Sequence, residues 1–253
     1  MVQPQLNLSY DPAIPGRKFD FFPANADSAP LLAMFHGGGW ISGDRAHLHE
    51  EAEWFASQGI NVASVGYRLA PLHPFPDPIA DIQEFMRFAK ANAKDLNTSG
   101  TQTISFGVSA GGHLACMAGL CDKAFRSEED VVLADGVVSI CAITDLRNPE
   151  ETQFPIAFSF LDQFIQEPHA LNPEPWAEAS PVTYVKEEAP PFLIFHGTAD
   201  DVVPVKQAQI LHSALNQVGS PSELHLLESE GHSFMFDTWN HMRQQIVEFV
   251  RTI

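Results

Sequence analysis

Short apolar runs alternate with longer amphipathic segments along the whole chain of 253 residues. Two of these runs, Leu31–Phe35 and 192–195, are apolar at consecutive positions, so we expect both of their faces to be buried, as in the centre of a parallel sheet. The alternation of such strands with helices is typical of βαβ units. The pattern therefore predicts an α/β fold with a mostly parallel central sheet flanked by helices.

The segments that form this pattern can be delimited by their apolar runs and by the turn residues between them. We expect strands at residues 18–22, 31–35, 60–65, 103–108, 136–141, 192–195 and 223–227. We expect helices at residues 46–58, 78–93, 110–120, 205–218 and 238–252, with Gly59 and Gly219 as helix stops. No repeat or break in composition divides the chain, so a single domain over residues 1–253 is predicted.

The charge balance is strongly acidic, with 14 Lys and Arg against 32 Asp and Glu and a formal net charge of −18. This excess argues against nucleic acid and anionic membranes as partners, because both are bound through Lys and Arg. No apolar stretch approaches the roughly 20 residues that span a bilayer, and the residues from Met1 onward show no signal-peptide pattern. The three cysteines have no metal-site spacing. We therefore expect reduced, packed thiols and a cytoplasmic location.

One segment, residues 145–176, interrupts the alternation of strands and helices and is rich in Phe and Pro. Insertions of this length between strands often form lids or pocket walls. We expect Phe154 and Phe158 of this segment to line a substrate pocket, together with Trp40.

A serine lies between an expected strand and an expected helix, with glycines on both sides, at Gly107, Ser109 and Gly111. A serine on a sharp strand-to-helix turn has an exposed hydroxyl and a strained backbone, and flanking glycines prevent clashes at that turn. We therefore predict that Ser109 is a nucleophile.

A nucleophilic serine needs a base to take its proton and an acid to orient that base. Asp200 follows the buried run at 192–195, and His232 follows the last expected strand. Ligands of open α/β sheets bind at the carboxyl ends of the strands, so we expect Ser109, Asp200 and His232 at one edge. Asp201 competes as the acid, because a shift of one residue in the loop would exchange the two.

Three consecutive glycines, Gly37 to Gly39, follow the buried run Leu31–Phe35. They let the backbone turn its N–H groups inward without steric cost, and such groups stabilise the oxyanion formed when a carbonyl is attacked. We predict that the amides of Gly38, Gly39 and Ala110 form an oxyanion hole, and that His36 is structural.

Together these motifs resemble those of α/β-hydrolases with the HGGG oxyanion signature, which include hormone-sensitive-lipase-like esterases and a compact branch similar to acetylxylan and feruloyl esterases. The matching segments occur in the family's order between about residues 30 and 236, namely 36–40, 66–71, 75–76, 107–112, 179–181, 196–204 and 231–234. The resemblance implies Ser109 as nucleophile, His232 as base and Asp200 as acid, since the family's acid is the Asp of an HGxxD pattern. The segment 66–71 is structural in the family, and we expect Arg68 to pair with a carboxylate such as Asp77 or Asp81.

The chain also departs from the hormone-sensitive-lipase-like pattern. Only 35 residues precede His36, which leaves no room for the helical N-terminal cap of the bacterial enzymes, so the insertion at 145–176 would cover the site instead. This difference favours the compact branch and short acyl groups of two to four carbons. Because Trp40 follows the glycines, the motif is also similar to that of arylformamidases, and amide hydrolysis remains the alternative.

The resemblance thus implies a serine carboxylesterase that hydrolyses short-chain acyl esters, acetylated carbohydrates among them, through an acyl-enzyme. Such a mechanism requires no metal and no organic cofactor. The expected partner is a small-molecule ester, and the sequence leaves open whether the chain is a monomer or a homodimer.

Overall fold

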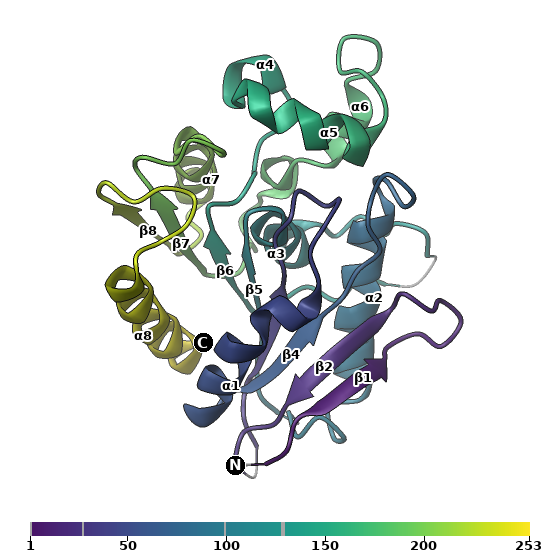
Figure 1. Cartoon of the computed structure of the whole chain (residues 1–253), viewed down its shortest axis with the longest axis vertical. Coiled ribbons are helices and arrows are strands. Elements are labelled where there is room, and N and C mark those ends of the chain that lie inside the picture. Colours follow the sequence, from purple (N-terminus) through teal and green to yellow (C-terminus); the bar gives the residue numbers. More distant parts are fainter. Residues whose placement is uncertain (1, 27, 99, 128–129) are drawn as a thin grey trace.

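A computed structural model describes residues 2–253 of the protein, except residues 27, 99 and 128–129. Eight strands form one sheet in the order β1-β2-β4-β3-β5-β6-β7-β8 (Figure 1). The pairs β1–β2 and β2–β4 are antiparallel and the remaining pairs are parallel. The strands are β1 (Gln5–Ser9), β2 (Lys18–Phe22), β3 (Leu31–Phe35), β4 (Asn61–Val65), β5 (Thr103–Val108), β6 (Gly136–Ile140), β7 (Phe192–Gly197) and β8 (Ser222–Leu227). The predicted mostly parallel sheet is confirmed.

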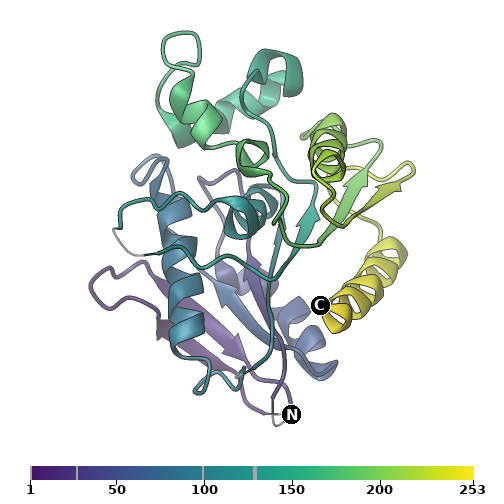
Figure 2. The same cartoon turned by 180° about the vertical axis from the view of Figure 1, so that it is seen from behind.

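Helices cover both faces of the sheet (Figures 1 and 2). One face packs against α1 (His49–Ser57) and α8 (Phe236–Thr252), and the other against α2 (Asp77–Ala91), α3 (Ala110–Leu120) and α7 (Lys206–Gln217). Successive residues of β3 contribute to the two cores in turn, since Leu32 packs with α1 and α8 while Leu31 and Ala33 pack with α2 and α3. This alternation explains why the strand is apolar at every position.

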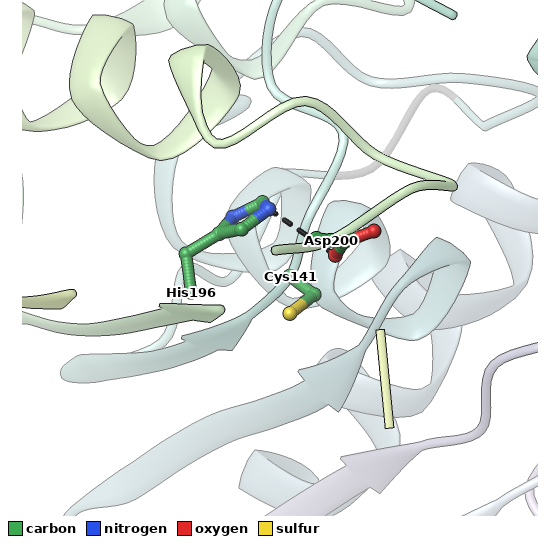
Figure 3. A group of neighbouring side chains, drawn as sticks. All are labelled: Cys141, His196 and Asp200. Carbon is green, nitrogen blue, oxygen red and sulfur yellow. Dashed lines mark ion pairs between the residues drawn. The ribbon is translucent and has the colours of Figure 1, made fainter. Parts of the chain in front are cut away.

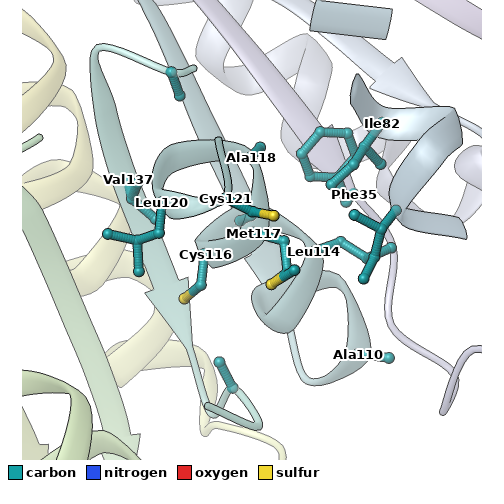
Figure 4. Close-up of a cluster of buried hydrophobic side chains, with 14 of the residues drawn as sticks. Phe35, Ile82, Ala110, Leu114, Cys116, Met117, Ala118, Leu120, Cys121 and Val137 are labelled. Atoms are coloured by element: carbon teal, nitrogen blue, oxygen red, sulfur yellow. The ribbon is translucent and has the colours of Figure 1, made fainter. Parts of the chain in front are cut away.

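Helix α3 lies at the centre of the larger core, where all of its residues are buried (Figure 4). Two of the cysteines, Cys116 and Cys121, pack there as small apolar side chains, and all three cysteines are free and buried, as expected. Burial raises the pKa of the Cys116 thiol to about 12 and that of Cys121 to about 11, so both are protonated at neutral pH. Within the described residues, no helix is long and apolar enough to cross a membrane.

Outside the insertion and η3, two elements differ most from the sequence-based expectation. Strand β1 lies outside the expected strands, because its residues are mostly exposed and polar and it pairs only with β2. The helix expected at 46–58 is divided into a 3₁₀ helix, η1 (Arg45–Leu48), followed by α1. Asp44 causes this early start, because its Oδ1 caps the amide of Ala46 at 2.8 Å.

An ion-pair network holds the loop that follows β4 against α2. Arg68 bonds the buried Asp81 through Nη2 at 2.7 Å and reaches Asp77 through Nη1 at 3.3 Å. Arg17 donates to the same Asp81 carboxylate at 2.8 Å. The expected pairing of Arg68 is confirmed with both carboxylates, which lie in the first two turns of α2.

The insertion at 145–176 lies beyond the carboxyl ends of the parallel strands (Figure 1). It contains α4 (Pro149–Thr152), η2 (Pro155–Ala157) and α5 (Phe158–Ile165). Helix α6 (Glu174–Glu178) begins at its end, and η3 (Pro181–Tyr184) leads back to the sheet. The stem of the insertion is fixed by the buried Gln207 of α7, which accepts from the amide of Asp145 at 2.7 Å and donates to the carbonyls of Asp145 and Thr152 at 3.0 Å. The insertion is therefore anchored at the edge where the predicted site residues lie.

Candidate active site

Ser109 occupies a strained turn between β5 and α3, with φ of 58° and ψ of −123°. A non-glycine residue in this region costs energy and is held there only by its surroundings. Its amide donates to the Ile140 carbonyl at 2.9 Å, and its carbonyl accepts from the amide of His113 at 3.0 Å. The turn is possible because Gly107 and Gly111 approach so closely that a Cβ on Gly107 would lie 2.0 Å from the Gly111 carbonyl oxygen. The predicted strand-to-helix turn is present.

Asp200 lies in the loop after β7, where four hydrogen-bond donors meet its buried carboxylate. Oδ1 accepts from the amides of Val202 at 2.9 Å and Val203 at 2.8 Å. Oδ2 accepts from His232 Nδ1 at 2.8 Å and lies 3.3 Å from His196 Nε2. Burial opposes ionisation, but the hydrogen bonds from His196, His232 and Val203 outweigh it and hold the pKa of Asp200 far below its usual range. The structure thus brings Asp200, and not the exposed Asp201, to His232.

His232 lies in the loop between β8 and α8, which is fixed to the Asp200 loop by backbone contacts. The Ala199 amide donates to the Glu230 carbonyl at 2.9 Å, and a Cβ on Gly197 would lie 2.3 Å from the same oxygen. The buried Glu230 carboxylate accepts from the Met235 amide at 2.9 Å and from the hydroxyl of Thr238 at the start of α8. Glu230 is not among the site residues predicted from the sequence. The only signal was its place two residues before His232.

The Ser109 turn and the Asp200–His232 pair lie at the same edge of the sheet. The carbonyl that accepts from Ser109 belongs to Ile140, and the next residue, Cys141, donates its amide to the Phe195 carbonyl at 2.9 Å. Its thiol sulfur and a carboxylate oxygen of Asp200 lie within 4.8 Å of each other. The backbone at Ile140 and Cys141 therefore lies between the Ser109 turn and Asp200 and contacts both.

Cys141, His196 and Asp200 form a cluster of metal-ligating residue types (Figure 3). His196 Nε2 lies 3.0 Å from the Val203 carbonyl, which can only accept, so this nitrogen carries a proton and has no free lone pair. Burial raises the pKa of the Cys141 thiol well above its ordinary value, whereas a metal ligand must be a thiolate. The Asp200 carboxylate and His196 Nε2 are engaged in hydrogen bonds and the Cys141 thiol is protonated, so the cluster does not suit a metal ion, although His196 Nδ1 has no hydrogen-bond partner among the described residues.

The loop at residues 36–40, termed here the glycine loop, lies against the Ser109 turn. A Cβ on Gly37 would lie 3.6 Å from the Ser109 Cβ. Gly38 and Gly39 have φ of 120° and 61°, and a Cβ on Gly38 would lie 2.2 Å from the Ser42 carbonyl oxygen. Among the described residues, no acceptor takes a hydrogen bond from the amides of Gly38, Gly39 or Ala110. These three amides are thus available to a ligand oxygen.

His36 supports the glycine loop from below, in line with the expected structural role. Its ring stacks on Tyr67 with centroids 4.3 Å apart, and the Tyr67 hydroxyl donates to the His36 carbonyl at 2.8 Å. Burial lowers the pKa of His36, so the ring is neutral at neutral pH.

One of the expected pocket residues, Trp40, requires a correction. Trp40 has no exposed surface, because its indole stacks on Phe164 of α5 with centroids 4.3 Å apart. Its ring is part of the core and does not line an open pocket. Phe158 is half-buried against the core, and Phe154 is exposed. A second residue of the insertion, Phe160, meets the glycine loop at Gly39, since its Cγ lies 3.0 Å from where a Cβ of Gly39 would be.

Comparison with known proteins places this architecture in a family. The model of the BD-FAE family matches residues 21–215. Among curated relatives, Esterase LipC of Mycobacterium tuberculosis is 34% identical over 219 residues, which cover 83% of this chain and 53% of the relative. The probable carboxylic ester hydrolase LipM of the same organism is 30% identical, with 76% and 46% covered. The chain spans about half the length of these curated relatives.

Solved structures support the same assignment. The butyrate-bound thermophilic esterase of Thermogutta terrifontis is 25% identical, with a TM-score of 0.81 over 97% of this chain and 93% of that one. A truncated carbohydrate esterase from gut microbiota is 18% identical, with a TM-score of 0.84 over 99% of this chain and 97% of that one, and shows the shared fold alone. The chain belongs to the BD-FAE family and has the α/β-hydrolase fold.

Proposed function

We propose that this chain is a serine carboxylic ester hydrolase that cleaves short-chain acyl esters through an acyl-enzyme. The observation that carries the proposal is the strained Ser109 turn, which shares one sheet edge with the hydrogen-bonded pair Asp200 and His232. The curated relatives named as esterases point to the same reaction class.

The proton path follows from the hydrogen bonds of His232. A carboxylate can only accept, so His232 Nδ1 carries the proton in its bond to Asp200 and Nε2 holds a lone pair. We assign Nε2 as the base that removes the Ser109 hydroxyl proton while Oγ forms a bond to the ester carbonyl carbon. The ionised Asp200 then stabilises the imidazolium.

We assign stabilisation of the negative charge on the carbonyl oxygen to the three free amides. Gly38, Gly39 and Ala110 would donate to the oxyanion of the tetrahedral intermediate, which collapses with cleavage of the bond to the alcohol oxygen. The His232 imidazolium gives its proton to that oxygen. Water then repeats the sequence on the acyl-enzyme, releasing the carboxylic acid and restoring the Ser109 hydroxyl.

We further propose that the insertion at 145–176 covers the site and limits the size of the acyl group. Phe160 packs against Gly39, one of the assigned oxyanion donors, and its ring would restrict the length of an acyl chain held beside that donor. The Thermogutta terrifontis esterase, at 25% identity, has been solved with butyrate and with propionate, both short acids. We expect the highest kcat/KM with acyl groups of two to four carbons.

The experiment combines a nucleophile variant with a substrate panel. Wild type is assayed on p-nitrophenyl esters of two to twelve carbons, acetylated xylan and N-formylkynurenine, beside Ser109→Ala and the control Ser233→Ala. We expect turnover of short esters by wild type and Ser233→Ala, and loss of turnover and of fluorophosphonate labelling in Ser109→Ala. Retained turnover in a folded Ser109→Ala protein contradicts the proposal. Preferential turnover of N-formylkynurenine would instead indicate the arylformamidase reaction.

A further inference from the structure

We propose that His113 is a positioning residue that holds the glycine loop in its oxyanion-binding shape by accepting a hydrogen bond from Trp40. The inference rests on the proposed function for its catalytic consequence. Trp40 Nε1 lies 3.1 Å from His113 Nδ1, across 73 positions of sequence, and both side chains have no exposed surface.

The two partners of His113 determine its tautomer. An indole N–H can only donate, so Nδ1 must hold a lone pair toward Trp40. The Ala179 carbonyl can only accept, so Nε2, at 2.7 Å, must carry the proton. Both ring nitrogens are thus satisfied in one neutral form. Burial favours the same form, since it lowers the pKa of His113 to about 4.

His113 connects the elements on which the assigned oxyanion hole depends. It belongs to α3, whose first residue is Ala110, and its amide binds the Ser109 carbonyl at 3.0 Å. Its ring reaches Trp40, the residue that directly follows the glycines, and Ala179, just after α6. One side chain therefore links the glycine loop, the nucleophile turn and the segment that follows α6.

The glycine loop needs such a restraint because its backbone is unusual. Three successive residues have positive φ, namely Gly38 at 120°, Gly39 at 61° and the non-glycine Trp40 at 61°. The indole of Trp40 is held on one side by the stack on Phe164 and at its nitrogen by His113. Loss of the His113 acceptor would leave a buried N–H unsatisfied, so the indole would shift and the adjacent amides would turn with it.

The test compares two substitutions that each preserve a different half of the His113 interactions. Asparagine places an oxygen near the position of Nδ1 and can accept from Trp40, whereas glutamine places its amide near Nε2 and can reach Ala179. We would measure kcat and KM on p-nitrophenyl acetate for His113→Asn, His113→Gln, Trp40→Phe and the double variant Trp40→Phe/His113→Gln. Circular dichroism and Tm establish that each protein is folded at the assay temperature.

We expect His113→Gln and Trp40→Phe each to lower kcat by about tenfold or more with little change in KM, because the lost interaction acts on the transition state. His113→Asn should retain most of kcat, and the double variant should lose no more than either single variant, because both remove the same bond. Equal losses in His113→Asn and His113→Gln, or additive losses in the double variant, would overturn the proposal.

A second readout separates this inference from the proposed function. The ¹H–¹⁵N resonances of the Gly38 and Gly39 amides should shift in His113→Gln and stay near their wild-type positions in His113→Asn, whether or not the protein hydrolyses esters. Unchanged glycine resonances in His113→Gln refute the positioning role. An inactive wild type with the expected resonance shifts refutes the esterase proposal alone.

Discussion

Replacement of Asp200 by asparagine keeps the size of the side chain but removes its charge and one of its two acceptor oxygens. Its carboxylate receives four donors, two backbone amides on Oδ1 and the two histidines His196 and His232 on Oδ2. Asparagine has a single acceptor oxygen and an NH₂ group that can only donate. In either orientation of the asparagine amide, its NH₂ group would face one of these two pairs of donors inside the protein.

The expected loss of kcat depends on which pair of donors, the two backbone amides or the two histidines, loses its acceptor. The backbone amides of Val202 and Val203 are fixed by the loop, so the asparagine oxygen should remain with them and its NH₂ should face His232. His232 would then adopt the opposite tautomer and present an N–H to Ser109 in place of a lone pair. A triad base in the wrong tautomer loses about 10⁴-fold in kcat, equivalent to about 5.5 kcal/mol in the barrier. Loss of the two charge-assisted hydrogen bonds to the histidines, with an NH₂ group now facing His196 Nε2, should also lower the free energy of unfolding by roughly 2 kcal/mol.

The assay is steady-state hydrolysis of p-nitrophenyl acetate, with urea unfolding measured on the same preparations. Asp201→Asn is the matched control, because Asp201 is the exposed neighbour that carries the same charge. We expect Asp201→Asn to retain kcat within about twofold, as surface substitutions usually do. A loss of less than about tenfold in a folded Asp200→Asn protein, or an equal loss in Asp201→Asn, would refute the role assigned to Asp200.

Three further predictions concern the glycine loop, the insertion and pH. Gly38→Ala should lower kcat by about 10²-fold, because its Cβ would lie 2.2 Å from the Ser42 carbonyl oxygen. The control Gly219→Ala, at a glycine with positive φ and open space around it, should lower only the free energy of unfolding, by about 1 kcal/mol. Equal kcat values for the two variants would contradict this prediction. Phe160→Ala should raise the ratio of kcat/KM on octanoyl to acetyl esters by about tenfold, while the control Phe154→Ala should leave it unchanged. Burial lowers the pKa of His113 from 6.5 to about 4. Between these pH values His113 is protonated in the unfolded chain but neutral in the folded protein, so the free energy of unfolding should fall by about 3 kcal/mol as the pH is lowered from 6.5 to 4. Urea unfolding should show this loss in wild type and a smaller one in His113→Asn; parallel pH curves would refute it.

Local patterns of sequence determined the arrangement of the elements. Runs such as Leu31–Phe35 are apolar at each position because both faces of the strand are buried, and that requirement is visible residue by residue. The strand-to-helix turn at Ser109 and the loops bearing Asp200 and His232 could likewise be placed at one sheet edge, since parallel strands end on the same side.

The resemblance favoured Asp200 as the acid, but the residues themselves left Asp201 open, and tertiary structure decided which side chains meet within those loops. Asp200 and Asp201 are adjacent and chemically identical, and only the packing of the loop after β7 buries one against His232 and exposes the other. The aromatic residue after the glycines suggested a pocket wall, yet Trp40 is a core residue because Phe164 and His113, both distant in sequence, enclose it. Contacts of this kind depend on distances between chain segments that no periodicity records, which is why the scaffold could be derived from the order of residues and the restraint on the glycine loop could not.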